Sequence, residues 1–455
     1  CIVSSSNAQN TEGFLPNITP PSPVAGELGK YGNVPVGLFT GAPNLSIPLL
    51  NFKTKNLESP ISLSYGSNGI KVDEVASNVG LGWNLIFGGV ITRTVRDQND
   101  DNQRMVYPPD DIPNASSDDR LQFYRAAGQE FADTEKDIYS FNFNGNSGKF
   151  IYDKNNVPVL VNNQKIKIER TGTNNADFLL TTANGIRYYF TEKETTAFRS
   201  QGAGHSIISA SVTAWYLTQL VHPNGSVISL VYENTFMDYT ASNSQTLTMA
   251  FTPGQTGCGR DFYVKAPTLS GIVAHEMSVV GKRIKKIYSN NSKEGYITFT
   301  YFTGGINAEV EGDSKIETLT HYNESNQVIE KVSFNYLKTA NGRVFLQNFT
   351  FLDPSKKYSF EYINQSNFPK RLSASQDHWG YYNGKSNSNL IPKNISGYGV
   401  TIDETQYSGA DKEPYADFAK TGMLSKVIYP AKGYTEFDYE GNTYWGEQTT
   451  YPARK

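Results

Sequence analysis

The sequence predicts an all-β protein made of antiparallel, hairpin-rich sheets. Aromatic residues form 13% of the 455 residues, with 29 Tyr and 25 Phe, and large rings pack well on the pleated surface of a sheet. Many short segments alternate apolar and polar residues with the period of two that half-buried strands show. Turn signals such as Asn-Gly separate several of these segments, as expected for hairpins.

Charge and cysteine content exclude several classes of protein. The formal net charge is -3, so the chain creates no overall field that attracts nucleic acid or anionic lipid. It contains no run of ~18 apolar residues, so we expect no membrane-spanning helix. The two cysteines, Cys1 and Cys258, stand at an extreme terminus and in a distant Gly-flanked loop, which is a poor arrangement for a disulfide. Stability must therefore come from a large core.

Residues 1–8 read as the remnant of a secretory signal peptide. The first three residues resemble the end of an apolar segment, and Ser6-Asn7-Ala8 supplies the small residues of a cleavage site before Gln9. A second interpretation, ranked lower, makes Cys1 the lipid-anchored terminus of the mature protein. Both interpretations place the protein outside the cytoplasm, either secreted or on the outer cell surface.

An extended leader and a β module follow the signal remnant. Residues 9–33 are rich in Pro, Gly and Asn, a composition that predicts an extended segment on the surface. Residues 34–135 predict a module, sandwich-like in part, with strands at 45–50, 61–65 and 90–95. The second strand places Ile61, Leu63 and Tyr65 on one face.

The Gly-Leu-Gly-Trp segment between these strands predicts a tight contact. Gly80 and Gly82 stand just before Trp83, and glycines in strand-rich sequence indicate bulges or close approach of another backbone. We therefore expect Gly82 and Trp83 to fix a strand-to-strand contact around a buried indole.

The end of the module contains a run of acidic residues and prolines between Asp97 and Asp119, which predicts an exposed loop. Residues 118–132 lack proline and carry apolar residues at helical spacing, so they predict one short helix. The Asp97-x-Asn99-x-Asp101 run imitates the start of a calcium loop. Asn102 replaces the Gly that such a loop needs, and Pro108 takes the place of the bidentate Glu. A solvated acidic loop is therefore favoured over an improvised calcium site.

Residues 136–375 predict a continuous series of antiparallel hairpins, with strands at 138–143 and 186–190 among them. Residues 217–233 align without gaps on residues 424–440, sharing Leu, Pro, Tyr and Glu at matching positions. The second strand of that hairpin recurs at 296–301, 332–336 and 358–362, and each copy ends in Tyr. Such degenerate repeats cannot bury one face alone, so they must stack side by side into a continuous sheet.

Four linked motifs resemble the N-terminal module of RHS and toxin-complex B-type proteins. They are Gly41-Ala-Pro-Asn-Leu-Ser-Ile-Pro48, Pro60-Ile-Ser-Leu-Ser-Tyr65, Val79-Gly-Leu-Gly-Trp-Asn-Leu85 and Ile91-Thr-Arg93, in the order that the family shows. Residues 97–215 and 240–375 share no motif with the family and are similar to it only in the general pattern of their predicted strands.

Residues 376–455 extend the resemblance to the YD-repeat proteins of Bacteroidetes. Asp377-His-Trp-Gly-Tyr-Tyr-Asn-Gly384 precedes the hairpin at 424–440, as in that family. Lys432 stands where the repeat usually has its first Gly, and long tandem repeats and the family's C-terminal core segment are absent from the sequence. The residues that carry the structural motifs of this resemblance are Tyr65, Gly80, Gly82, Trp83, Trp379, Gly380, Tyr381, Pro430 and Tyr439.

The resemblance implies an RHS/YD-shell-like fold and a structural role. In the family, strips of hairpins curl into a hollow shell that encloses a toxic C-terminal domain. It implies that the partners of this chain are its own C-terminal repeats or a cargo domain beyond Lys455, with secretion machinery as a further partner. Relatives in Bacteroidetes imply outer-membrane or secreted placement, for example by a type IX route.

Few residues form a pattern typical of a catalytic or metal site, and we expect no catalytic residue, metal or cofactor. The five histidines show no metal-ligand spacing. His275-Glu276 has no second His four residues on, and Gly202-Ala-Gly-His-Ser206 lacks a nucleophile elbow. No sequence feature supplies a base to Cys258. A non-enzymatic protein is the prediction.

The strongest candidate for a binding site is the cluster of Asp377, Trp379, Tyr381 and Tyr382. Its carboxylate and three rings could line a glycan-binding surface. The favoured interpretation is that Gly380 and Gly384 let a bend pack Trp379 into the sheet. The first functional hypothesis is thus a shell module, and the second is a cell-surface adhesin or glycan-binding β module. Burial of the three rings favours the shell, and exposure favours the adhesin. A secreted glycosidase is a third class, for which the sequence gives no support.

Overall fold

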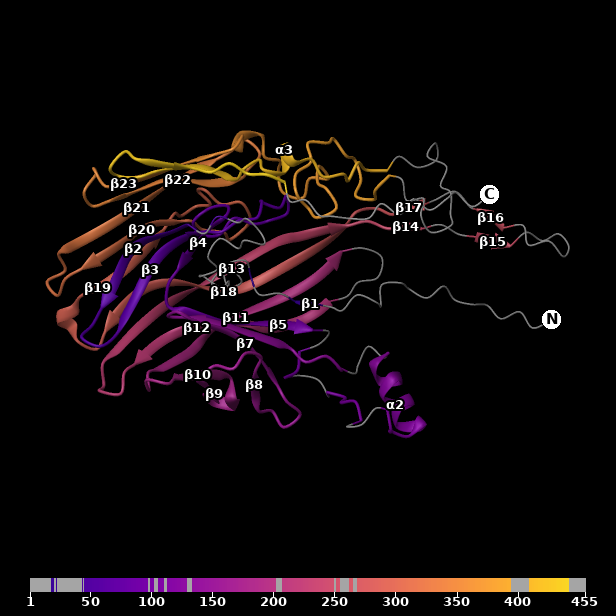
Figure 1. Ribbon diagram of the computed structural model, residues 1–455, viewed down its shortest axis with the longest axis horizontal. Coiled ribbons are helices and arrows are strands. Elements are labelled where there is room, and N and C mark those ends of the chain that lie inside the picture. Colours follow the sequence, from indigo (N-terminus) through magenta and orange to yellow (C-terminus); the bar gives the residue numbers. More distant parts are fainter. Residues whose placement is uncertain are drawn as a thin grey trace.

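A computed structural model of the chain describes residues 18–19, 22, 43, 45–96, 99–101, 105–109, 113–128, 133–201, 207–248, 251–253, 262–264, 268–393 and 409–441. Nearly all of their regular structure is antiparallel strand, and 18 strands join in one sheet. The predicted all-β, hairpin-rich fold is confirmed (Figure 1).

Two groups of strands form the first half of the large sheet. In one group, β5 (Gly89–Arg96) pairs with β6 (Ile138–Phe143), β6 with β7 (Asn146–Tyr152), and β7 with β8 (Pro158–Leu160). In the other, β9 (Ile166–Thr171), β10 (Asp177–Thr182), β11 (Arg187–Gln201) and β12 (Ile207–Val221) follow one another. The groups join where β5 pairs with β12.

Two long strands, β13 (Val227–Ser244) and β18 (Val273–Ser289), extend the sheet into an arm. The outer part of β11 pairs with β18 on the other side. Beyond the arm lie two short hairpins: β14 (Leu247–Thr248) with β17 (Thr268–Leu269), and β15 (Phe251–Pro253) with β16 (Phe262–Val264). Figure 1 shows this arm reaching to the right of the molecule.

A meander of neighbouring strands completes the sheet after β18. Each strand pairs antiparallel with the next, which confirms the predicted lateral stacking of the hairpin repeats. Its members are β19 (Tyr296–Tyr301), β20 (Ile316–Tyr322), β21 (Val328–Lys338), β22 (Val344–Phe351), β23 (Lys357–Tyr362), β24 (Leu424–Ile428) and β25 (Tyr434–Glu436).

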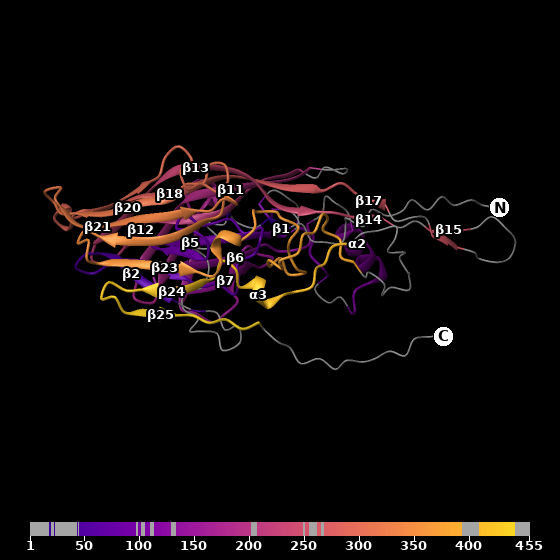
Figure 2. The same cartoon turned by 90° about the horizontal axis from the view of Figure 1, so that it is seen from above.

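The N-terminal module contributes a separate three-stranded sheet of β2 (Leu45–Lys53), β3 (Glu58–Tyr65) and β4 (Trp83–Ile86). Its apolar residues belong to the same hydrophobic core as the large sheet, a core that extends from Ile47 to Val427. In Figure 2, β18, β20 and β21 lie along one side of the molecule and β24 and β25 along the other. The three-stranded sheet therefore packs against the curved large sheet.

The helices of the described residues are short. Residues 117–127 form α2 (Ser117–Ala127), which the sequence predicted at 118–132. Its Ser116 N-cap accepts a hydrogen bond from Asp119 N at 3.1 Å, and Gly128 follows its last turn. One turn of helix, α3 (Ala416–Ala419), precedes β24. No helix in the described part of the chain is long and apolar enough to cross a membrane.

Part of the leader is not a surface segment, contrary to the prediction for residues 9–33. Ile18–Thr19 form the short strand β1, which pairs with Val95 and Arg96 at the end of β5. Ser22 is buried, with 1% of its surface exposed. Polar backbone groups at the end of β5 explain this position, because a two-residue strand satisfies them. The other residues of 1–33 lie outside the described residues.

Candidate functional site

The Gly-Leu-Gly-Trp motif lies at the contact between the two sheets. Trp83 and Tyr65 are fully buried, and their ring centroids are 5.2 Å apart. Gly82 has a φ of +73°, and a Cβ atom there would lie 2.6 Å from Tyr65 Cε2. Gly80 has a φ of +100°, and its Cβ would lie 2.8 Å from the backbone nitrogen of Leu346. Both positions therefore require glycine, as the sequence predicted.

The partners of Trp83 come from the C-terminal hairpins. The indole Nε1 donates a hydrogen bond to the Tyr362 hydroxyl at 2.9 Å, and the ring lies 4.5 Å from Phe360 on the same strand, β23. The Tyr65 hydroxyl accepts a hydrogen bond from Leu424 N at 2.8 Å. The motifs at the two ends of the chain thus form a single site.

The tyrosines that end the hairpin repeats all make the same contact. Each hydroxyl donates a hydrogen bond to a backbone carbonyl between 15 and 20 residues earlier, and each acceptor is an aliphatic residue. The pairs are Tyr232 with Leu217, Tyr301 with Ile284, Tyr336 with Ile316, Tyr362 with Leu346 and Tyr439 with Leu424, at 2.6–2.9 Å. We refer to these five pairs as the tyrosine ladder.

β-bulges lie beside acceptors of the ladder. The strand register shifts immediately before Tyr301, Tyr336 and Tyr362. A bulge leaves one residue without its ladder partner and increases the local twist of the strand. At two of these shifts the cross-strand partner, Ile316 or Leu346, is the acceptor of the next tyrosine hydroxyl in the ladder. Burial raises the pKa of Tyr336 well above its ordinary value, so its hydroxyl stays a donor.

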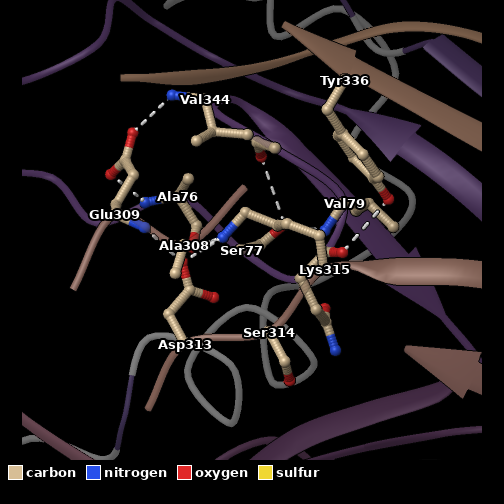
Figure 3. Close-up of polar contacts among 12 residues, drawn as sticks. Ala76, Ser77, Val79, Ala308, Glu309, Asp313, Ser314, Lys315, Tyr336 and Val344 are labelled. Carbon is tan, nitrogen blue, oxygen red and sulfur yellow. Dashed lines mark hydrogen bonds and ion pairs between the residues drawn. The ribbon is translucent and has the colours of Figure 1, made fainter. Parts of the chain in front are cut away.

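A buried polar cluster connects the segment before Trp83 to the meander (Figure 3). The Glu309 carboxylate accepts hydrogen bonds from Ala76 N at 3.0 Å and from Val344 N at 2.8 Å. It also pairs with Arg343, whose Nε lies 3.2 Å from Glu309 Oε1, and both side chains are 1% exposed. Because breaking a buried ion pair leaves an uncompensated charge, this pair fixes the loop around residues 72–79.

A second buried ion pair in the same cluster joins Lys315 and Asp313. Asp313 Oδ2 also accepts a hydrogen bond from Glu309 N at 2.9 Å, which links the two pairs. Arg343 Nη1 donates to Val72 O at 2.9 Å. Sequence reasoning missed this cluster, because its contacts to Ala76 and Val72 join residues 233 and 271 positions apart and leave no local pattern. Every charge in the cluster has a protein partner, so the cluster is structural.

Most of the described residues from 107 to 119 are exposed, as predicted, but the start of the acidic loop is bound to a buried group. Arg93 is fully buried and binds the buried Asp137, and it also donates to Asp101 Oδ2 at 2.6 Å and to Asn99 Oδ1 at 2.5 Å. A buried guanidinium needs anionic partners, and the loop supplies them. Asp97, Asn102 and residues 110–112 lie outside the described residues, which hold no group of His, Cys, Asp and Glu side chains suited to a metal ion.

Asp377 is a turn-forming residue. Its side chain is 2% exposed, and Oδ1 accepts hydrogen bonds from Trp379 N at 2.8 Å and Tyr381 N at 2.9 Å. Gly380 has a φ of +91°. Trp379 is 58% exposed, so the prediction that it packs into the sheet is wrong. The Asp377 carboxylate holds the turn in a shape that turns the indole outward.

The other two rings of this segment are half-buried and point to different neighbours. Tyr381 forms an isolated bridge with Lys71, whose Nζ lies 5.9 Å from the ring centroid. Tyr382 packs edge-on against Phe418 at 5.6 Å. The structure therefore does not gather Trp379, Tyr381 and Tyr382 into one continuous ring surface.

Pro430 lies in the turn of the last described hairpin, and Tyr439 follows its second strand, β25. Pro430 follows β24, and Tyr429 N donates to Gly433 O at 2.8 Å across the turn. Lys432 has a φ of +64° in this turn. The departure from the usual Gly thus falls at a left-handed position that glycine adopts at lower cost.

The catalytic motifs rejected from the sequence give no assembled site in the described residues. The His275 ring lies between two serine hydroxyls, with Ser200 Oγ 2.9 Å from Nδ1 and Ser244 Oγ 2.8 Å from Nε2. Both ring nitrogens are therefore used in cross-strand contacts of the arm. Cys1, Cys258 and residues 202–206 lie outside the described residues.

The buried carboxylate of Glu194 holds the leader, a contact that sequence reasoning missed. Its oxygens accept hydrogen bonds from Ser22 N at 2.8 Å, Ser22 Oγ at 2.5 Å and Tyr216 OH at 2.9 Å. Glu194 is 1% exposed, and burial raises its pKa. The alternating run around Glu194 gives no signal for a partner 172 residues away.

Comparison with protein-family models and with curated proteins finds no match. Among solved structures, eleven chains match. The chain is similar to the TcdB2-TccC3-Cdc42 crystal structure, at 11% identity over 72% of this chain and 16% of that one, with a TM-score of 0.35. It is also similar to the Photorhabdus luminescens Tc holotoxin pore, at 10% identity over 72% of this chain and 16% of that one, with a TM-score of 0.35. A third similar structure is the N-terminal domain of effector protein SpvB from Salmonella typhimurium strain LT2, at 11% identity over 68% of this chain and 98% of that one, with a TM-score of 0.29. The chain thus spans 16% of the length of the two toxin-complex chains.

Proposed function

We propose that this chain is a non-catalytic wall module of a larger exported RHS/YD-repeat-like protein that encloses a C-terminal cargo or toxin domain. The tyrosine ladder supports this role, because the same hydroxyl-to-carbonyl contact recurs from Tyr232 to Tyr439 and ties successive hairpins into one curved sheet. A wall needs repetition and curvature and no reacting groups. Most charged groups of the interior are neutralised by protein partners.

The test uses the natural gene product, including whatever polypeptide follows Lys455. Limited proteolysis of the intact protein should leave the segment after Lys455 uncut under conditions that digest the same segment expressed alone. Electron microscopy should show a hollow particle. Equal cleavage of the attached and isolated segments, or a stop codon directly after Lys455, would count against an enclosing wall.

A second candidate function is a glycan-binding or adhesive surface module, and one observation favours it. Trp379 is 58% exposed beside the Asp377 turn, and an exposed indole on a rigid turn can stack on a sugar ring. Quenching of indole fluorescence by oligosaccharides in the wild type, absent from Trp379→Phe, would support it. Identical titrations in the two proteins would exclude Trp379 as the contact.

A further inference from the structure

A polar pocket lies where three turns meet, at the end of the two packed hairpins β6–β7 and β10–β11. The hairpins face one another through aromatic rings, with Phe143 and Tyr188 centroids 4.5 Å apart. The pocket has a volume of about 720 Å³, which is within the range of pockets that hold small ligands.

The lining of the pocket is almost entirely neutral. Of its twelve residues one, Lys165, carries a charge, and none is a carboxylate. Four are amides, which come from all three turns: Asn144, Asn146, Gln164 and Asn184. A cation site would need carboxylates and an anion site would need several cations. An apolar ligand would leave the amides without partners.

Internal hydrogen bonds orient the amides on two of the walls. Asn144 Nδ2 donates to the Tyr188 hydroxyl at 3.4 Å, and Gln164 Nε2 donates to Ser147 O at 2.7 Å. Each bond uses one of the two N–H donors of its amide and fixes the orientation of the group, so the carbonyl oxygen is left as an acceptor.

On the third wall the amide is held by its oxygen instead of its nitrogen. Asn184 Oδ1 accepts from Thr182 Oγ1 at 2.5 Å and from Ile186 N at 3.3 Å, so its NH₂ group is left as a donor. The pocket therefore offers fixed acceptors on two walls and a donor on the third.

We propose that this pocket binds a neutral saccharide. Sugar hydroxyls donate and accept hydrogen bonds at the same atom, which matches a rim of fixed carbonyl oxygens and an amide donor. Tyr188 is buried to 2% exposure, so its ring is not a stacking platform. Recognition is through the hydroxyl edges of the sugar, at a site separate from Trp379. The proposal is independent of the wall function, since either can hold without the other.

The test measures saturation-transfer NMR between the full chain and a panel of methyl glycosides of glucose, galactose, mannose, N-acetylglucosamine and glucuronate, with the disaccharides of the neutral sugars. The first variant is Asn144→Gly. Asn144 has a φ of +42°, so glycine keeps the turn while removing the amide. The second variant is Gln164→Ala, on a different wall. Each should weaken binding of the responsive sugar about tenfold, the loss of one hydrogen bond to a ligand.

The matched control is Asn156→Gly, at another exposed hairpin turn with a φ of +60°. It should bind the sugar as the wild type does, and melting curves of all variants should show that each is folded. Absence of transfer from every sugar at millimolar concentration, binding untouched by both pocket variants, or a response only to an acidic sugar such as glucuronate would overturn the proposal.

Discussion

Trp83 illustrates how a single residue joins parts of the chain that are far apart in sequence. Its ring packs on Phe360 and its Nε1 binds Tyr362. Replacing it by Ala removes one of the two fully buried indoles of the described residues and leaves a cavity. We expect Trp83→Ala to lower the free energy of unfolding by about 3–5 kcal/mol in urea titrations.

The control for this substitution is Trp379→Ala. The Trp379 side chain is 58% exposed, so its loss should change stability by about 0.5 kcal/mol or less. An unchanged melting temperature in Trp83→Ala would refute the role of the indole as an anchor.

Lys432 carries a backbone cost that glycine at the same position would avoid. Its φ of +64° lies in the left-handed region, where a side chain is strained by about 1 kcal/mol or more. We expect Lys432→Gly to raise the free energy of unfolding by roughly 0.5 kcal/mol, because the greater chain entropy of glycine offsets part of the gain. Lys356→Gly is the control, since Lys356 is not among the positive-φ residues. A less stable Lys432→Gly variant would contradict this interpretation.

Glu194 makes the stability of the leader contact depend on pH. Burial raises the pKa of Glu194 in the native state above its unfolded value, so the native state binds the proton more tightly. The resulting stabilisation is complete below the unfolded pKa and is lost as pH rises through the higher native pKa.

The variant Glu194→Gln cannot ionise and should lack this loss. From about pH 4 to about pH 8, the melting temperature of the wild type should fall relative to that of Glu194→Gln. Glu317→Gln, at an exposed position, controls for the loss of a negative charge. The prediction is refuted if the melting temperatures of the wild type and Glu194→Gln change by the same amount across this pH range.

At the scale of elements, the tyrosine ladder predicts unequal roles for tyrosines on the two faces of the meander. Tyr336→Phe removes the donor to the buried Ile316 carbonyl, and an unsatisfied buried acceptor costs about 1–3 kcal/mol. Tyr296→Phe removes only an exposed bond to Asn326 and should cost about 0.5 kcal/mol or less. Denaturant titrations that give equal losses would show that the ladder adds no specific stability.

Two strands whose partners are adjacent in sequence were predicted to the residue. The expected strands at 138–143 and 296–301 match β6 and β19, because alternation and a nearby turn define both edges. The expected strand at 186–190 falls short of β11, which continues to Gln201. Its outer half pairs with β18, and pairing with a strand far along the sequence leaves no local signal.

In the candidate site, too, local features were predictable from the sequence and long-range contacts were not. The need for glycine at Gly80 and Gly82 and the burial of Trp83 followed from the motif itself. The ion pair of Glu309 and Arg343 did not, because each is an ordinary surface residue type whose burial depends on its partner. Trp379 was misjudged, since a large ring next to glycines is compatible with both a core and an outward turn.

For the whole molecule, the distribution of buried residues predicts a wide range of local stabilities. α2 contains no buried residue, whereas β22 contributes four fully or nearly fully buried apolar residues, Val344, Phe345, Leu346 and Phe349. Hydrogen exchange should therefore be fastest in α2 and slowest in β22, near the global free energy of unfolding. Comparable exchange rates in the two elements would show that the described core is not a cooperative unit.

The junction between Tyr65 and Leu424 has a consequence for how the newly made polypeptide matures. The hydrogen-bonded partners are 359 positions apart, and a ribosome adding roughly 5–20 residues per second delivers the second partner on the order of 20–70 s after the first. During that interval the amino-terminal strands exist without the surface that covers them. Their apolar faces are exposed to solvent during this time. We therefore expect a chaperone that binds nascent chains to cover them until the C-terminal strands are made.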